Sequence, residues 1–208
     1  MASEQKDLVI LAADKQMEYA LRGILGRDQS LGIRQLQVEY IPHPNKDPGC
    51  RSVAEKFLRP FHQDFAHALV IFDHHGAGRP DSAADELEKE VEDRLRKSGW
   101  EDRAQCIVIE PELEVWVWSD SPQVKRCLEW DREIRLREWL QERGRWEPGK
   151  EKPGQPKEAL ERVLRETGLP RSSALFRKLA ERMSLQRCND RAFVKLRRIL
   201  REWFSKKK

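Results

Sequence analysis

The sequence predicts an α/β fold, with a mostly parallel sheet flanked by helices and followed by an all-helical C-terminal part. Over residues 1–120, short apolar runs typical of strands buried on both faces alternate with stretches of helical periodicity. After Pro122 only helical periodicity remains. Alternating strands and helices favour parallel pairing. We therefore expect an α/β domain over residues 1–120 and a basic helical region over residues 121–208 packed on it.

The strands of the first part are predicted from apolar runs and from alternation. Residues 7–13 form a continuous apolar run, and residues 34–41 alternate with period two. Two further buried strands are expected over residues 67–72 and 103–109. Between them, amphipathic stretches predict helices over residues 15–25, 52–61 and 81–97.

Turn and capping residues separate these elements. The first helix should stop at Gly26, and residues 42–49 are rich in turn formers and predict a loop. Asp81 and Ser82 are suitable caps for the third helix. In the C-terminal part a Gly- and Pro-rich segment over residues 144–156 predicts an exposed loop. The helices expected there span residues 132–142, 157–166, 173–183 and 191–204.

Size and composition exclude several classes of protein. The chain has 208 residues, of which 38% are hydrophobic and 37% charged, and its seven Trp and seven Phe can fill an interior. Full disorder is therefore not expected. The apolar runs fall far short of the roughly 20 residues that a bilayer requires, and the N-terminus has no export signal. We expect a cytoplasmic protein without a membrane segment.

The four cysteines lie far apart in the sequence. They form no CxxC pair and have no nearby histidine at the spacing of a metal site, so neither a zinc ribbon nor a redox motif is indicated. We interpret them as reduced thiols that mostly pack in the interior.

Charge is divided unevenly along the chain. Residues 1–120 hold 15 Lys and Arg against 23 Asp and Glu, whereas residues 121–208 hold 25 against 13. An acidic first part is suited to a divalent cation, and a basic second part offers a surface for phosphates. The alternative is that long amphipathic helices simply carry solvated arginines.

Acidic residues follow three of the predicted strands. Asp14 follows the first, with Glu18 one helical turn later, and Asp73 with His74 and His75 follows the third. The fourth strand is followed by Glu110, Glu112 and Glu114. In open parallel sheets these ends meet at one edge, where several carboxylates would repel one another unless a hard cation such as Mg²⁺ or Mn²⁺ lay between them.

Structural interpretations of the same residues remain open. Asp14 can cap the helix that follows it, Glu18 can be a solvated charge, and His74 and His75 can be hydrogen-bonded loop residues. An acid at the head of a helix, such as Glu112 or Glu114, is stabilised by the helix dipole. Asp73 is the hardest to explain in this way, since it directly follows a buried apolar strand.

These motifs resemble the Toprim fold of topoisomerases, primases and OLD-type nucleases. Within it the chain looks most like small stand-alone Toprim-like proteins of prokaryotic defence loci, including the RloB-like group. ADKQME is similar to the EGxTE motif, FDHHGAG to the DxD motif, and EPELEVW to a later motif ending in E-x-W. The resemblance implies a Mg²⁺ site that contains Asp14, Glu18 and Asp73.

Two departures from the family pattern stand at its metal-binding positions. Asp14 replaces the usual Glu and has a shorter side chain, and His75 replaces the second Asp of DxD. One anionic ligand is lost with this histidine. Glu110, Glu112 or Glu114 could restore the missing charge, or the site could have lost its metal.

Two functions of different classes follow. The first is a Mg²⁺-dependent nuclease of antiviral defence, with Asp14, Glu18 and Asp73 on the metal and His75 as general acid or base. The second is a catalytically inactive Toprim-like module that binds nucleic acid or partner proteins, with Trp130, Trp139, Trp146 and Trp203 as candidate interface anchors. The alternative is that these tryptophans fill the helical core, which we favour for Trp139 and Trp203. Phosphate contacts are predicted for a set of basic residues on the last two helices: Arg177, Lys178, Arg182, Arg187, Arg191, Lys195, Arg197, Arg198 and Arg201.

Two further classes receive less support. A nucleotide-binding regulator lacks any glycine-rich phosphate loop in this sequence. The DHH triplet at residues 73–75 also occurs in a family of phosphoesterases, but the other Asp and His motifs of that family are missing. We interpret the triplet as a coincidence.

Overall fold

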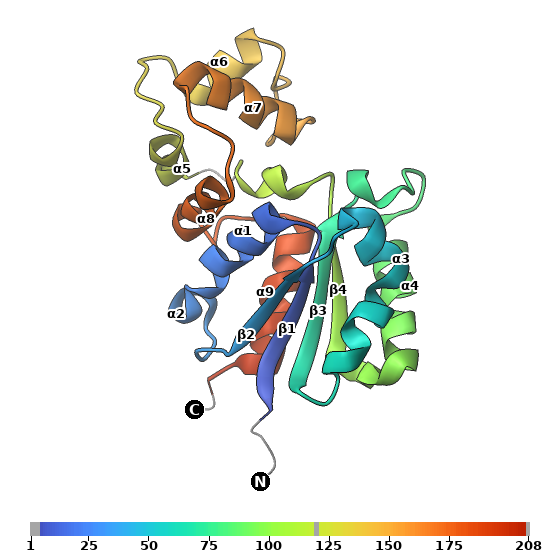
Figure 1. The fold of residues 1–208 in the computed structure, drawn as a ribbon. Coiled ribbons are helices and arrows are strands. Elements are labelled where there is room, and N and C mark those ends of the chain that lie inside the picture. Colours follow the sequence, from blue (N-terminus) through green and yellow to red (C-terminus); the bar gives the residue numbers. More distant parts are fainter. Residues whose placement is uncertain (1–4, 119–120, 207–208) are drawn as a thin grey trace.

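A four-stranded parallel sheet forms the centre of the computed structural model, which describes residues 5–118 and 121–206 (Figure 1). The strand order is β2-β1-β3-β4. Ile10 of β1 pairs in register with Tyr40 of β2 and Leu69 of β3. The α/β fold that the sequence predicts is confirmed. The strands are β1 (Lys6–Ala12), β2 (Val38–Pro42), β3 (Phe65–Asp73) and β4 (Ala104–Ile109).

Helices cover both faces of the sheet. α3 and α4 lie on one side and α1 and α9 on the other, whereas α6 and α7 lie beyond the carboxyl ends of the strands (Figure 1). In the described parts of the chain, no helix is long and apolar enough to cross a membrane. The α-helices of these parts are α1 (Lys15–Leu25), α2 (Asp28–Leu31), α3 (Lys46–Leu58), α4 (Ala84–Leu95), α5 (Pro122–Cys127), α6 (Leu136–Glu142), α7 (Pro156–Thr167), α8 (Ser173–Arg182) and α9 (Arg191–Phe204).

The C-terminal helix α8 packs closely on α1, and a glycine makes this possible. A Cβ atom placed on Gly23 would lie 2.7 Å from the Arg177 carbonyl oxygen and 2.9 Å from the Ala180 Cβ. Both distances are shorter than real contacts allow. Gly23 therefore sets the distance between the first helix and the C-terminal region.

We expect Gly23→Ala to lower the free energy of unfolding by about 1–3 kcal/mol, because the added methyl group forces α1 and α8 apart. Urea denaturation measures the effect. Gly26→Ala is the matched control, since a Cβ there meets only backbone atoms of its own helix. Equal stability of the two variants would contradict a packing role for Gly23.

The outer edge of β4 is closed by acidic side chains of α4. Glu88 Oε1 accepts a hydrogen bond of 2.9 Å from the Val108 N–H, and Glu92 Oε1 accepts one of 3.0 Å from the Cys106 N–H. An open strand edge exposes such N–H groups to other chains. The two glutamates satisfy these donors and block strand addition at this edge.

Two basic residues of α9 complete this arrangement, which we call the edge network: Glu88, Glu92, Arg191 and Lys195. Lys195 Nζ lies 3.1 Å from both Glu88 Oε2 and Glu92 Oε1, and Arg191 Nη1 lies 3.0 Å from Glu88 Oε2. The Glu88 side chain is only 5% exposed. The network thus joins α9 to α4 around the edge of the sheet.

Strand β2 starts four residues later than the alternating pattern predicts. Arg34 pairs with Asp7 at 2.5 Å, and the Gln37 N–H donates to Asp7 Oδ2 at 2.7 Å. The Arg34 N–H donates to the Phe204 carbonyl oxygen. Residues 34–37 are held by these contacts and enter no strand ladder.

Two helices also differ from the prediction. α3 begins at Lys46, inside the expected loop, and has a kink at Val53, where φ is −140° and ψ is 20°. α4 begins after Ala83, whose N–H donates to the Glu86 side chain, so neither Asp81 nor Ser82 is its cap. The local sequence does not reveal which of several nearby residues becomes the N-cap of a helix in the folded protein.

Candidate active site at the strand ends

Asp14 and Glu18 follow β1 but have different surroundings. Asp14 is the N-cap of α1, and its Oδ1 accepts from the Met17 N–H at 2.9 Å. Glu18 is buried and accepts from Arg22 Nε at 2.8 Å. The Arg22 guanidinium lies over the Tyr40 ring at 4.2 Å. The Glu18 carboxylate is thus bound to Arg22, whose guanidinium packs on the edge strand β2.

Asp73 is the last residue of β3, and Asp47 of α3 lies against it. Asp47 Oδ1 accepts from the Asp73 N–H at 2.8 Å. The Asp73 Oδ1 atom is buried and has no hydrogen-bond partner among the described residues. A Cβ atom on Gly76 would overlap the Asp47 carboxylate, so the absence of a side chain there makes room for this acid. Asp47 is a site residue that the sequence analysis did not identify.

The electrostatics of Asp73 reveal a cluster of acids, which we call the strand-end carboxylates: Asp14, Asp47, Asp73, Glu112 and Glu114. Burial raises the pKa of Asp73 well above its ordinary value, and the negative charges of the other four raise it further. Burial also raises the pKa of Asp47. The fold thus brings together carboxylates from four separate segments of the chain at one end of the sheet.

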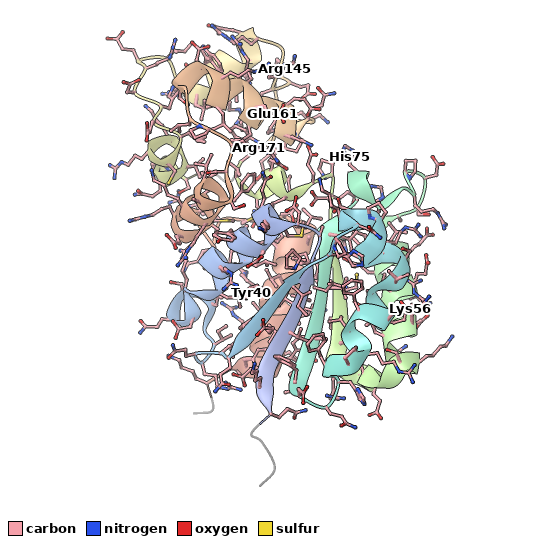
Figure 2. The ribbon with its side chains drawn as sticks, viewed as in Figure 1. Tyr40, Lys56, His75, Arg145, Glu161 and Arg171 are labelled. Atoms are coloured by element: carbon pink, nitrogen blue, oxygen red, sulfur yellow. The ribbon has the colours of Figure 1, made fainter. Side chains whose placement is uncertain are left out.

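The two glutamates that follow β4 have partners from the helical part. Glu112 Oε1 accepts from the Lys157 N–H at 3.1 Å, and burial raises the Glu112 pKa. Glu114 is buried and paired with Arg171, which also donates to Gln16 Oε1 at 2.7 Å. Figure 2 shows Arg171 between α7 and the α/β layers. Arg171 is therefore the cation that partly balances the cluster.

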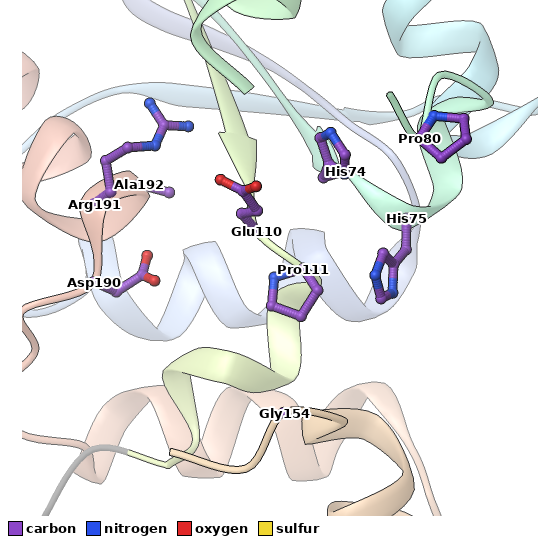
Figure 3. Close-up of a pocket in the computed structure, with 9 residues that line it drawn as sticks. All are labelled: His74, His75, Pro80, Glu110, Pro111, Gly154, Asp190, Arg191 and Ala192. Carbon is purple, nitrogen blue, oxygen red and sulfur yellow. The ribbon is translucent and has the colours of Figure 1, made fainter. Parts of the chain in front are cut away.

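An open pocket of about 560 Å³ lies beside the cluster and is lined by His75, Glu110 and Arg191. In Figure 3 Pro111 lies between His75 on one side and Glu110 and Arg191 on the other. His75 is exposed, whereas His74 is buried and its Nε2 lies 2.7 Å from the Ser82 carbonyl oxygen. His74 is thus a hydrogen-bonded loop residue, and His75 faces solvent in the pocket.

The basic residues predicted to contact phosphates fall into two groups. On α8, Lys178 and Arg182 are exposed, and Arg177 pairs with Glu181 at 2.9 Å. On and before α9 the cations have mostly internal partners. Arg191 and Lys195 belong to the edge network, Arg197 donates to the Leu185 carbonyl, Arg198 to Glu202, Arg201 to the Leu31 carbonyl, and Arg187 lines a second pocket.

The tryptophans considered as interface anchors are not exposed. Trp130, Trp139 and Trp146 are 3%, 2% and 7% exposed, and Trp203 is half-buried and stacked on His67 with 4.3 Å between ring centroids. The hypothesis of exposed anchors is wrong for Trp130 and Trp146, whose rings fill the interior of the helical part, and core packing, the interpretation favoured for Trp139 and Trp203, agrees with their positions. Core packing explains all four.

The donor set matches a hard divalent cation in its chemistry. In the parts of the chain that the structure describes, no three His, Cys, Asp or Glu side chains form a group that could hold a metal ion. The cluster nevertheless supplies carboxylate oxygens, which Mg²⁺ and Mn²⁺ prefer, and one of them is buried without a partner. Asp14, Asp47 and Asp73 are the residues that would hold such an ion.

Comparison with known proteins adds no assignment to this site. No family model, no curated protein and no solved structure matches the chain.

Proposed function

We propose that this chain is a divalent-cation-dependent phosphodiesterase that cleaves nucleic acid in the cytoplasm, with Asp14, Asp47 and Asp73 as its cation ligands. The observation that carries the proposal is the buried, unpartnered Asp73 Oδ1 among four other carboxylates at the strand ends. A lone carboxylate oxygen in such a position is costly unless it has a ligand. The carboxyl ends of parallel strands are also where α/β proteins bind ligands.

A role in prokaryotic antiviral defence is part of the same proposal. It rests on the resemblance of ADKQME, FDHHGAG and EPELEVW to the motifs of Toprim-like defence proteins. Within that resemblance Asp47 is an additional acid, and it supplies the negative charge that His75 does not.

The residues of the site would divide the chemistry among them. A bound Mg²⁺ or Mn²⁺ would supply a Lewis acid for the phosphodiester and lower the pKa of a water molecule. Arg171 holds Glu114 in place by an ion pair, and so keeps the charge of the cluster in balance. His75 is exposed in the adjacent pocket and acts as the general acid that donates a proton to the leaving oxygen.

A second candidate is a catalytically inactive module that binds nucleic acid or a partner protein. One carboxylate oxygen of Asp14 accepts from the Met17 N–H, and one of Asp47 accepts from the Asp73 N–H. The described side chains also form no group that could hold a metal ion as they stand. Both observations favour a site in which carboxylates have become structural.

Calorimetric titration with Mn²⁺ distinguishes the two candidates. We expect the native protein to bind Mn²⁺ and Asp47→Asn to bind it at least about tenfold more weakly, since a charged ligand is lost. Asp64→Asn, an exposed acid at the opposite end of β3, is the control and should bind like the native protein. The absence of binding to the native protein would support the inactive module.

Cleavage is then tested on labelled single- and double-stranded DNA and RNA with Mn²⁺ present. We expect cleavage by the native protein and by Asp64→Asn, and none by Asp47→Asn. Nucleic-acid binding should weaken steeply as salt rises, since exposed cations such as Lys178 and Arg182 release counterions from phosphates. Binding that is indifferent to salt would contradict a role for these side chains.

A further inference from the structure

A second pocket lies in the helical part, away from the strand-end carboxylates. It has a volume of about 540 Å³, and its described lining carries five Lys and Arg residues, among them Lys125, Arg137 and Lys152, one acid, Glu151, and apolar residues that include Leu136, Trp118 and Trp146. None of the strand-end carboxylates contributes to its wall. Cations above an apolar wall favour a ligand that carries both a negative charge and an apolar group.

Lys152 gives this pocket its chemical character. Its Nζ atom is buried and has no hydrogen-bond partner among the described residues. An ammonium group in this position is unfavourable, because burial removes its water and no carboxylate among the described residues replaces it. An anionic ligand would supply the missing partner.

A second cationic group, the Arg197 guanidinium, lies nearby and is only partly satisfied, since its Nη1 donates to the Leu185 carbonyl oxygen. Arg197 Nε is also buried without a partner, and the charges of both Lys152 and Arg197 act on the Cys188 thiol. Asp190 acts on the same thiol, but its Oδ1 already accepts from Trp116 Nε1 at 2.8 Å. Asp190 is therefore engaged elsewhere, and the described lining of the pocket holds five cationic residues against one acid, Glu151, so positive charge is in excess here.

The two tryptophans present only apolar surface to the pocket. Trp118 Nε1 donates to the Pro156 carbonyl and Trp146 Nε1 to the Lys150 carbonyl, each at 3.0 Å, so both indole N–H groups are satisfied. Their rings meet edge to face with centroids 5.5 Å apart. The Arg137 guanidinium lies over the Trp146 ring at 5.0 Å. Aromatic walls with fixed cations are the combination that binds bases and phosphates.

We propose that this pocket binds a nucleotide, with its phosphate on Lys152, Lys125 and Arg137 and its base against the apolar wall. The nucleotide is either a free mononucleotide or one unpaired nucleotide of a nucleic-acid strand, since the recognised chemistry is the same. The sequence has no glycine-rich phosphate loop, but a phosphate that is bound by Lys and Arg side chains does not require one. The pocket shares no residue with the proposed cation site and does not depend on it.

Calorimetry at low salt with a chelator present tests the proposal with four probes: AMP, adenosine, inorganic phosphate and a 5′-phosphorylated single-stranded oligonucleotide. We expect AMP to bind more tightly than either adenosine or phosphate. An oligonucleotide that binds more tightly than AMP identifies a strand as the ligand, and the reverse order identifies a free nucleotide. Equal affinity for AMP and phosphate, or no binding of AMP and oligonucleotide, overturns the proposal.

Lys152→Met should weaken AMP binding by at least about tenfold, because a charge-assisted contact is lost. Lys150→Met is the matched control, since Lys150 is exposed and is not among the residues that line the pocket. The melting temperature of Lys152→Met without ligand should be higher than that of the native protein, which excludes misfolding as the cause. Lys125→Met, at an exposed position, provides a second variant. Unchanged AMP affinity in both Lys152→Met and Lys125→Met would also overturn the proposal.

Discussion

Replacing Asp73 with Asn is expected to make the metal-free protein more stable and to remove its response to Mn²⁺. The substitution keeps the shape of the side chain but removes the charge of a carboxylate whose buried Oδ1 has no partner among the described residues. This change should raise the free energy of unfolding by about 1–3 kcal/mol. For a chain of this size the melting temperature rises by about 2–4 °C per kcal/mol. A functional residue that lowers stability in this way is typical of binding sites.

The change in stability on addition of Mn²⁺ distinguishes a metal-binding Asp73 from one that only affects stability. At a Mn²⁺ concentration of 100 times its dissociation constant, the native protein should gain about 2.7 kcal/mol of stability, and Asp73→Asn should gain almost none. Asp64→Asn is the control for both measurements and should behave like the native protein. If Asp73→Asn were less stable than the native protein and still stabilised by Mn²⁺, Asp73 would be a structural residue.

The pH dependence of the same variant follows from the raised pKa of Asp73. Burial and the neighbouring carboxylates raise this pKa well above 3.8, so the folded chain holds the proton more tightly than the unfolded chain. The free energy of unfolding of the native protein therefore falls as pH rises from about 4 through the raised pKa. The stability difference between Asp73→Asn and the native protein should widen over that range, as thermal melts at several pH values can measure.

Glu88→Ala is expected to lower the free energy of unfolding by about 3–5 kcal/mol, the second large effect. The variant leaves Lys195 and Arg191 without their shared buried partner and removes the acceptor of the Val108 N–H. The edge of β4 would also be open to another strand, so light scattering should detect association near the melting temperature.

Glu90→Ala is the control for the edge network, because Glu90 lies on the same helix and pairs with Arg94 at 2.7 Å but is 41% exposed. Its loss should cost less than about 1 kcal/mol. Urea denaturation of both variants measures the difference. A loss for Glu88→Ala no larger than for Glu90→Ala would contradict a structural role of the network.

Part of the candidate site could be predicted from the sequence, because polar residues at strand ends are marked by the strand itself. Asp14 and Asp73 each follow an apolar run, and the fold brings both to the same end of the sheet. Asp47 could not be recognised in this way, since it lies in a segment rich in turn formers. Its position after the second strand was the available signal, and only the hydrogen bond to the Asp73 N–H reveals its role.

Arg171 was hidden for a different reason. It lies in the basic half of the chain, where one arginine among many has no distinguishing pattern, yet it pairs with Glu114 and Gln16. The partners of Arg191 and Lys195 were equally invisible, because Glu88 lies more than a hundred residues before them. Long-range ion pairs have no local sequence signature.

The sequence by itself determined the alternation of strands and helices, the parallel sheet and the helix limits of α1 and α9, since periodicity reflects burial along each element. The tertiary structure decided which charges meet. It brings Asp47 to Asp73 and Arg171 to Glu114. It also leaves Lys152 buried without a partner. These outcomes depend on distances between segments that are far apart in the chain, and no local pattern encodes such distances.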